Sequence, residues 1–173
     1  CADPTLKTAC AACSGIRILR QDPWEALCSF ILSQNNNIPR IRGIVERLCE
    51  RFGRPRYFGG ETYYTFPKPA ELAGRSLEEM EPVRAGFRAR YILDAARMVA
   101  SGEVDGESVR TLPLERARET LMRIPGVGPK VAHCVLLYGA GRLTAFPADV
   151  WIRRVLRESY GGESCDPAIF GPY

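Results

Sequence analysis

The chain has 173 residues, of which 46% are apolar and 25% are charged, and this composition excludes an intrinsically disordered protein. Its length is sufficient for one domain with a sizeable hydrophobic core. No apolar run reaches the roughly 18–20 residues needed to span a bilayer, and no signal-peptide pattern opens the chain, so we expect no membrane partner.

The net charge of +4 is mild, but the choice of basic residue is uneven. Only Lys7, Lys68 and Lys130 are lysines among 24 basic residues, and the rest are arginines. Arginine suits bidentate contacts with phosphates and bases, although a bias in genomic composition would give the same pattern. On either explanation, a lysine at position 130 is an unusual choice for this chain.

The seven cysteines do not indicate a disulfide scaffold, because their number is odd and several lie on apolar helix faces. We therefore expect a reduced, intracellular protein, in the cytoplasm or nucleoid of a bacterium or the nucleus of a eukaryote. Cys10 and Cys13 form a single CxxC pair, and a zinc site needs more ligands than this pair and the lone His133. The sequence predicts no cofactor and no metal held by side chains, and His133 is expected at the surface.

In chain order, residues 1–15 are small and polar, and we interpret them as the tail of a missing N-terminal domain that precedes a single domain over 16–173. The stretch 16–20 is a short strand or a linker. A helix is predicted from Pro23, because Asp22 is a good N-cap residue and proline suits the first helical position. Asparagines end this helix.

The rest of the first two thirds also has helical periodicity, with no convincing alternation at period two. Residues 53–69 are predicted as a loop rich in glycine, proline and aromatic residues, and Ser76 begins a capping box. The fold class is therefore all-α, with several helices around a single core. Further helices are expected over 39–52, 70–73, just after Ser76, and 87–99.

A helix, a glycine turn and a second helix follow. Residues 114–122 are helical in pattern, the turn carries Gly126 and Gly128, and proline at 129 suits a new helix start. Such a turn leaves backbone N–H groups at a helix N-terminus, where an anion such as a DNA phosphate can bind. Lys130 lies on the first turn, where the helix dipole disfavours an ammonium, and a neutral amine is a nucleophile.

Asp149, 19 positions after Lys130, is predicted to cap a third helix over 150–159. This stretch resembles the helix-hairpin-helix, glycine/proline-rich loop and aspartate motif of the DNA glycosylase superfamily. The resemblance implies catalysis by Lys130 and Asp149, and the lysine is typical of the bifunctional glycosylase/lyase branch. The alternative is a merely structural turn, a surface lysine and a helix cap.

Residues 15–53 resemble the start of the helical region in 8-oxoguanine DNA glycosylases. The resemblance implies that Asn35 fills the gap left by the flipped base and that Arg40 binds the estranged cytosine. It also implies that Phe87 wedges into the base stack and that Arg88 hydrogen-bonds the cytosine. The alternatives are a simple helix end for the asparagines and a core aromatic for Phe87.

The same resemblance places Cys134, one turn after Lys130, against the extruded guanine, although a small buried hydrophobic residue is nearly as good an interpretation. It implies a monovalent cation on the backbone carbonyls of Met122, Ile124 and Val127. Trp151 departs from the histidine of many eukaryotic relatives. From the same resemblance we expect this chain to be without the family's N-terminal β-containing domain and its last helix, because residues 169–173 stop as if a helix were about to begin.

The sequence thus predicts the helical core of a base-excision-repair glycosylase with AP-lyase activity. Its partner would be double-stranded DNA with 8-oxoguanine opposite cytosine, bound by a monomer. Three alternatives stay open: a related glycosylase for other oxidised bases, a non-catalytic helix-hairpin-helix DNA-binding module, and an inactive gene fragment. Lys130 together with Asp149 argues against the module, because phosphate binding needs neither residue.

Overall fold

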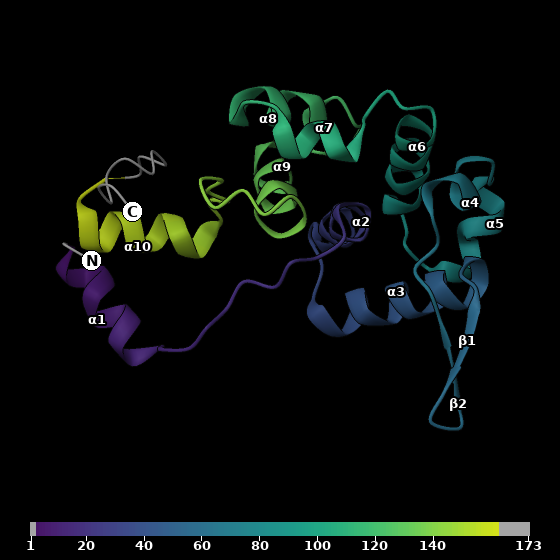
Figure 1. Ribbon diagram of the computed structural model, residues 1–173, viewed down its shortest axis with the longest axis horizontal. Helices are drawn as coiled ribbons and strands as arrows, with labels where there is room; N and C mark the ends of the chain where they lie inside the picture. The colour runs from purple at the N-terminus through teal and green to yellow at the C-terminus, as the bar shows by residue number, and fades with distance from the viewer. Residues whose placement is uncertain (1–2, 163–173) are drawn as a thin grey trace.

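The computed structural model describes residues 3–162, and these are mostly helical (Figure 1). None of the helices in this range is long and apolar enough to cross a membrane. In chain order the elements are α1 (Pro4–Ala12), α2 (Pro23–Ser33), α3 (Ile38–Phe52), β1 (Pro55–Phe58), β2 (Glu61–Tyr64), α4 (Pro69–Ala73), α5 (Leu77–Met80), the 3₁₀ turn η1 (Glu81–Val83), α6 (Arg88–Ala100), α7 (Gly106–Thr111), α8 (Leu114–Met122), α9 (Pro129–Cys134), the π-helical turn η2 (Val135–Gly139) and α10 (Val150–Tyr160).

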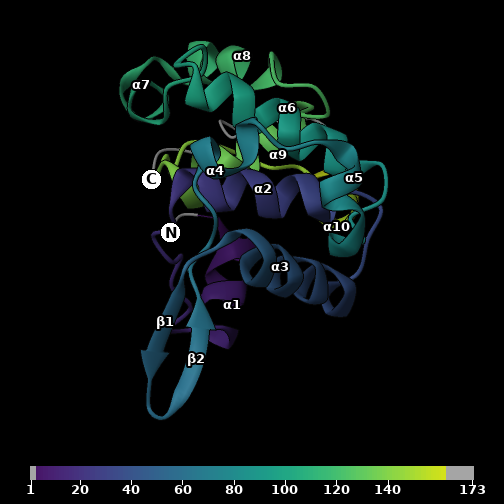
Figure 2. The ribbon, with the colours of Figure 1, turned by 90° about the vertical axis from the view of Figure 1, so that its right-hand side faces the viewer.

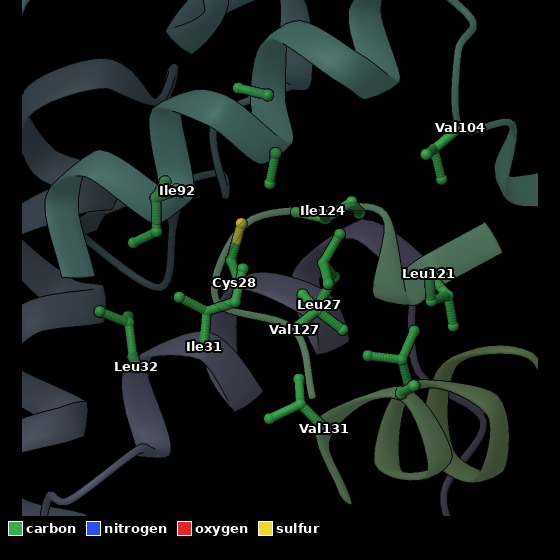
Figure 3. Close-up of a cluster of buried hydrophobic side chains, with 14 of the residues drawn as sticks. Leu27, Cys28, Ile31, Leu32, Ile92, Val104, Leu121, Ile124, Val127 and Val131 are labelled. Atoms are coloured by element: carbon green, nitrogen blue, oxygen red, sulfur yellow. The ribbon is translucent and has the colours of Figure 1, made fainter. Parts of the chain in front are cut away.

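Helix α2 lies at the centre of the core. It contacts α3, α6, α9 and η2, and Figure 2 shows it between α3 and the layer that contains α9. Its side chains Leu27, Cys28 and Ile31 are buried and lie close to Ile124 and Val127 of the glycine turn (Figure 3). Each of these leucine, isoleucine and valine side chains stabilises the fold by about 1.5–3 kcal/mol when fully buried, so the turn is held against α2.

The predicted helix starts are confirmed by their capping bonds. The Oδ1 atom of Asp22 accepts the N–H groups of Trp24 and Glu25 at 2.9 and 3.0 Å. Ser76 and Glu79 form the complete capping box, with both reciprocal bonds present. These caps fix where α2 and α5 begin.

Two short elements were not predicted. Residues 4–12 form α1, capped by Asp3, and Asp3 Oδ1 also accepts the hydroxyl of Tyr160 at 3.0 Å, which brings α1 beside α10 (Figure 1). Helix α1 has no buried residue, so the hydrophobic periodicity that identifies a helix is absent there. Residues 106–111 form α7, a helix of six residues that is too short for a clear period.

The expected loop over 53–69 contains a β-hairpin instead. Strands β1 and β2 pair antiparallel, with Phe58 opposite Glu61, and Gly59 and Gly60 between them have φ of 61° and 83°. A two-residue hairpin turn of this kind needs positive φ at both residues, and a Gly-Gly pair in the sequence is typical of such a turn. All the strand residues are exposed, so no alternation of burial marks them. The all-α class holds apart from this ribbon.

Candidate active site

The glycine turn between α8 and α9 depends on one of its two glycines for conformation. Gly126 has φ of 83°, and a Cβ there would lie 2.5 Å from the ring of Tyr91. Gly128, the N-cap of α9, has φ of −90° and open space around a Cβ. The fold therefore requires glycine at 126, whereas at 128 only the close approach of a ligand would require it.

Lys130 and Asp149 line the same pocket, although they are far apart along the chain. Lys130 extends from the first turn of α9, with Nζ 5.8 Å from the ring centroid of Phe30. The pocket has a volume of about 440 Å³ and is lined mainly by apolar side chains around these two charged groups and a thiol: Ile18, Phe30, Lys130, Cys134, Leu137, Tyr138, Leu143, Ala145, Phe146, Pro147, Asp149 and Ile152.

Asp149 is the N-cap of α10, as predicted. One carboxylate oxygen, Oδ1, accepts the backbone N–H groups of Trp151 and Ile152 at 3.0 and 2.9 Å. Within residues 3–162, the other oxygen accepts no hydrogen bond and is available to the pocket. The capping bonds hold the carboxylate in one orientation, so its charge is fixed in direction.

Cys134 is buried at the wall of this pocket. Burial raises the pKa of its thiol, the nearby charge of Lys130 lowers that pKa, and the charge of Asp149 raises it. A thiol with a raised pKa is neutral near pH 7 and acts as an apolar, polarizable surface. Both charged residues thus influence the same thiol, as expected if they face one cavity.

A second cluster of predicted residues lies at the C-terminal end of α2. The side chain of Asn36 donates to the carbonyl of Leu32 at 2.9 Å, and Asn37 caps α3 by accepting the N–H of Arg40 at 3.0 Å. Asn35 is exposed in the left-handed region, with φ of 45°, and its side chain makes no hydrogen bond within the described chain. Two of the three asparagines are therefore structural, and Asn35 alone has a free amide.

Arg88 holds this turn in place. Its side chain is only 2% exposed, and the guanidinium donates to the backbone carbonyls of Gln34 and Asn35, with a bond of 2.8 Å from Nη2 to the latter. Burial lowers the pKa of Arg88, and the positive charge of Arg40 adds to that effect. The sequence pattern gave no sign of these carbonyl partners, so the predicted contact between Arg88 and cytosine stays a prediction.

Phe87 and Arg40 are presented to solvent, as a wedge and a base contact must be. Phe87 is 57% exposed and packs edge-on against Tyr91, with ring centroids 6.0 Å apart. Arg40 makes no ion pair within residues 3–162, and it lines a pocket of about 420 Å³ together with Arg84 and Glu81. The sequence did not predict that Arg84 lines this pocket with Arg40. Arg84 has φ of 58°, a left-handed conformation that arginine rarely adopts, so its residue type gives no signal for it.

His133 is half-buried, not at the surface as expected. Its Nδ1 accepts the backbone N–H of Phe146 at 2.9 Å. Cys10 and Cys13 are free and exposed, and no group of three or more metal-ligating side chains occurs in the part of the chain that the structure describes. Cys1, Cys165 and residues 169–173 lie outside the described residues.

The carbonyls expected to bind a monovalent cation belong to the glycine turn. The Ile124 carbonyl accepts the N–H of Val127 at 3.0 Å, which leaves one of its two lone pairs for a cation. The carbonyl chemistry therefore fits a hard monovalent ion. A cation held by Met122, Ile124 and Val127 stays a prediction.

Comparison with known proteins identifies the family of the chain. The model of the HhH-GPD superfamily base excision DNA repair protein matches residues 28–168. The chain belongs to this superfamily. A second model, the 8-oxoguanine DNA glycosylase N-terminal domain, matches residues 1–27. The glycine turn between α8 and α9 lies within the matched range of this HhH-GPD chain, and its helix–turn–helix form agrees with a helix-hairpin-helix.

Other members of the superfamily match almost the whole chain. An N-glycosylase/DNA lyase of Saccharomyces cerevisiae is 39% identical over 84% of this chain and 42% of its own length. The structure of MBOgg1 in complex with a low-affinity DNA ligand is 51% identical, with a TM-score of 0.87 over 91% of this chain and 55% of that one. The Clostridium acetobutylicum 8-oxoguanine glycosylase/lyase, bound to dsDNA with cytosine opposite 8-oxoG, is 38% identical, with a TM-score of 0.85 over the same shares.

This HhH-GPD chain spans about half the length of the curated relatives it matches. The matched half includes the hairpin, the turn with Asn35, and the pocket that Lys130 and Asp149 line. Family membership therefore covers the residues on which a mechanism can be argued.

Proposed function

We propose that this chain is the helical core of an 8-oxoguanine DNA glycosylase with AP-lyase activity. The observation that carries the proposal is that Lys130 and Asp149 line one pocket, together with the buried thiol of Cys134. An amine and an oriented carboxylate in an apolar cavity suit nucleophilic displacement at a sugar. The similarity to N-glycosylase/DNA lyases and to 8-oxoguanine glycosylase structures supports this reaction and this substrate.

The protein would contact the DNA at two places, a backbone phosphate and the position that the flipped base vacates. The N–H groups of the hairpin at Gly126 and Gly128 would bind a phosphate of the damaged strand. On the other side, Asn35 and Phe87 would occupy the space that the flipped nucleotide leaves, and Arg40 would hydrogen-bond the orphan cytosine. Exposure of all three side chains supports these assignments.

The reaction would proceed through a covalent enzyme–DNA intermediate. The lone pair of the Lys130 amine attacks C1′ of the flipped nucleotide, and the glycosidic bond breaks as its electron pair leaves with the base. The attacking nitrogen loses one proton and the departing base takes up one, so the step balances. Asp149 stabilises the positive charge that develops on the sugar. The ring-opened sugar forms a Schiff base with Lys130. Loss of a proton from C2′ then expels the 3′ phosphate and cuts the strand, and water hydrolyses the Schiff base to release the enzyme.

Borohydride trapping tests this proposal. Reduction of the Schiff base should link the whole protein to duplex DNA that holds 8-oxoguanine opposite cytosine. Lys130→Gln should abolish the crosslink while DNA binding is largely kept, because the phosphate contacts come from backbone N–H groups. Lys7→Gln, on exposed α1, is the matched control and should trap as the parent does. An undiminished crosslink in Lys130→Gln, mapped to another residue, would refute the mechanism.

A further inference from the structure

His133 is the only histidine of the chain, and it connects the two elements that carry the proposed catalytic pair. It lies on α9, one turn after Lys130. Its Nδ1 accepts the backbone N–H of Phe146, three residues before Asp149, at 2.9 Å. Phe146 lines the same pocket as Lys130 and Asp149. The bond therefore crosses from the helix of the amine to the loop of the carboxylate.

Other hydrogen bonds of the loop between η2 and α10 either stay within the loop or anchor its start. The N–H of Ala145 bonds to the carbonyl of Arg142, and the N–H of Ala148 bonds to the carbonyl of Phe146, so both of these bonds stay within the loop. The guanidinium of Arg142 anchors the start of the loop on the carbonyls of Arg110 and Leu112. The bond to His133 anchors its end, immediately before the cap of α10.

This anchor requires an unprotonated Nδ1. A neutral imidazole can accept at one nitrogen, whereas an imidazolium donates from both and accepts from neither. The charged groups that act on the ring come from α8: Arg118 and Glu115, which are ion-paired to each other at 2.6 Å. Burial lowers the pKa of His133 below its ordinary 6.5, and Arg118 lowers it further while Glu115 opposes. The neutral acceptor is thus the form present near pH 7.

We propose that His133 is a positioning residue, whose neutral imidazole holds the loop leading to Asp149 at a fixed distance from Lys130. The inference rests on the proposed function, because the geometry that it controls is that of the Lys130–Asp149 pair. Protonation of the ring replaces the acceptor by a second N–H, which faces the N–H of Phe146 and releases the loop. The carboxylate then loses its fixed relation to the amine.

Two substitutions separate the acceptor from the rest of the side chain. His133→Asn places Oδ1 where Nδ1 was, so the bond to Phe146 is kept, and asparagine and histidine have similar helix propensities. His133→Leu fills the space without an acceptor and is the better helix former, so a loss of activity cannot come from a weaker helix. Both are made in the whole protein, and single-turnover excision and borohydride trapping are measured between pH 5 and 8.

The Leu variant should excise about three- to tenfold more slowly at pH 7.5, as expected for one lost hydrogen bond, and the Asn variant should match the parent. The pKa of His133 lies below the ordinary 6.5, so the parent should lose rate at a lower pH than a free imidazole would, as His133 takes up a proton, and the Asn variant should lack this acid limb. The inference is overturned if the Leu variant is as fast as the parent, if the Asn variant is as slow as the Leu variant, or if the acid limb persists in Asn.

A readout besides activity separates this inference from the proposed function. Hydrogen exchange of the Phe146 amide, followed with a ¹⁵N-phenylalanine label, should be slow in the parent and in the Asn variant. The protection of this amide, relative to an unprotected amide at the same pH, should be lost in the Leu variant, and in the parent once the pH is low enough to protonate His133. If the parent neither excises nor traps, the proposed function fails, and equal exchange rates in all three proteins would separately overturn the assignment of His133.

Discussion

Arg40 and Arg88 are two arginines with the same predicted partner but opposite environments, and the structure makes their substitutions distinguishable. Arg88 is buried on the carbonyls of Gln34 and Asn35, whereas Arg40 is exposed and makes no ion pair within the described residues. Hydrogen bonds that involve a charged group contribute about 1.5–3 kcal/mol each. Loss of both carbonyl contacts in Arg88→Ala should therefore cost about 3–6 kcal/mol of folding free energy.

In a chain of this size, 1 kcal/mol corresponds to roughly 2–4 °C, so Arg88→Ala should lower the melting temperature by roughly 10 °C. Excision should fall for both opposite bases, because the turn that carries Asn35 is released. Arg40→Ala should leave the melting temperature unchanged and should reduce the preference for cytosine over adenine, by about 1–3 kcal/mol if a bidentate contact is lost.

The assays are thermal unfolding and single-turnover excision opposite cytosine and opposite adenine, in parent and variant. The reasoning is refuted if Arg88→Ala keeps the parent's melting temperature while its cytosine-to-adenine ratio collapses. That result would mean that Arg88 binds the base directly, as the family resemblance implies, and that the carbonyl contacts contribute little.

Three further predictions concern the backbone and the carboxylate. Gly126→Ala should destabilise the fold strongly in urea titrations, since its Cβ would lie 2.5 Å from the ring of Tyr91. Gly128→Ala should fold normally but bind duplex DNA more weakly in a binding assay. Equal stability of the two variants would contradict this difference. Arg84→Gly should raise the free energy of unfolding by up to about 1 kcal/mol, because its φ of 58° is strained for arginine, and a loss of stability would show that the side chain stabilises the fold. Asp149→Asn should keep the melting temperature, because asparagine also caps helices well, but should slow single-turnover excision at least tenfold; parent-like rates would remove Asp149 from the mechanism.

Helix positions were largely predictable because local rules decided them. Asp22, Ser76 and Asp149 cap the helices that they were expected to cap, and the glycine turn lies where its punctuation indicated. The predictions failed where burial gives no pattern. Helix α1 has no buried residue and the hairpin over 55–64 is exposed throughout, so neither has the apolar period that distinguishes a helix from a strand.

The candidate site was predictable as a set of residues but not as a set of bonds. The meeting of Lys130, Cys134 and Asp149 in one pocket agrees with the spacing and the motif. The bond from Phe146 to His133 and the burial of Arg88 depend on contacts between segments that are distant in sequence, and no local pattern encodes those. A polar residue can serve a ligand or the backbone, and only the tertiary structure decides between the two.

Gln34 connects the two halves of the proposed site. Its side-chain amide donates to the carbonyl of Gly126 at 3.0 Å, while its own backbone carbonyl accepts from Arg88 at 2.9 Å. One residue at the end of α2 thus touches the hairpin that would bind phosphate, and also the arginine that supports the turn of Asn35. Side chains that fill the vacated position in the base stack can hold the flipped nucleotide in a reactive geometry only if their distance from the phosphate-binding hairpin is constant. The hydrogen bonds of Gln34 set that distance within a single rigid unit, since α2 is also the most central helix of the core.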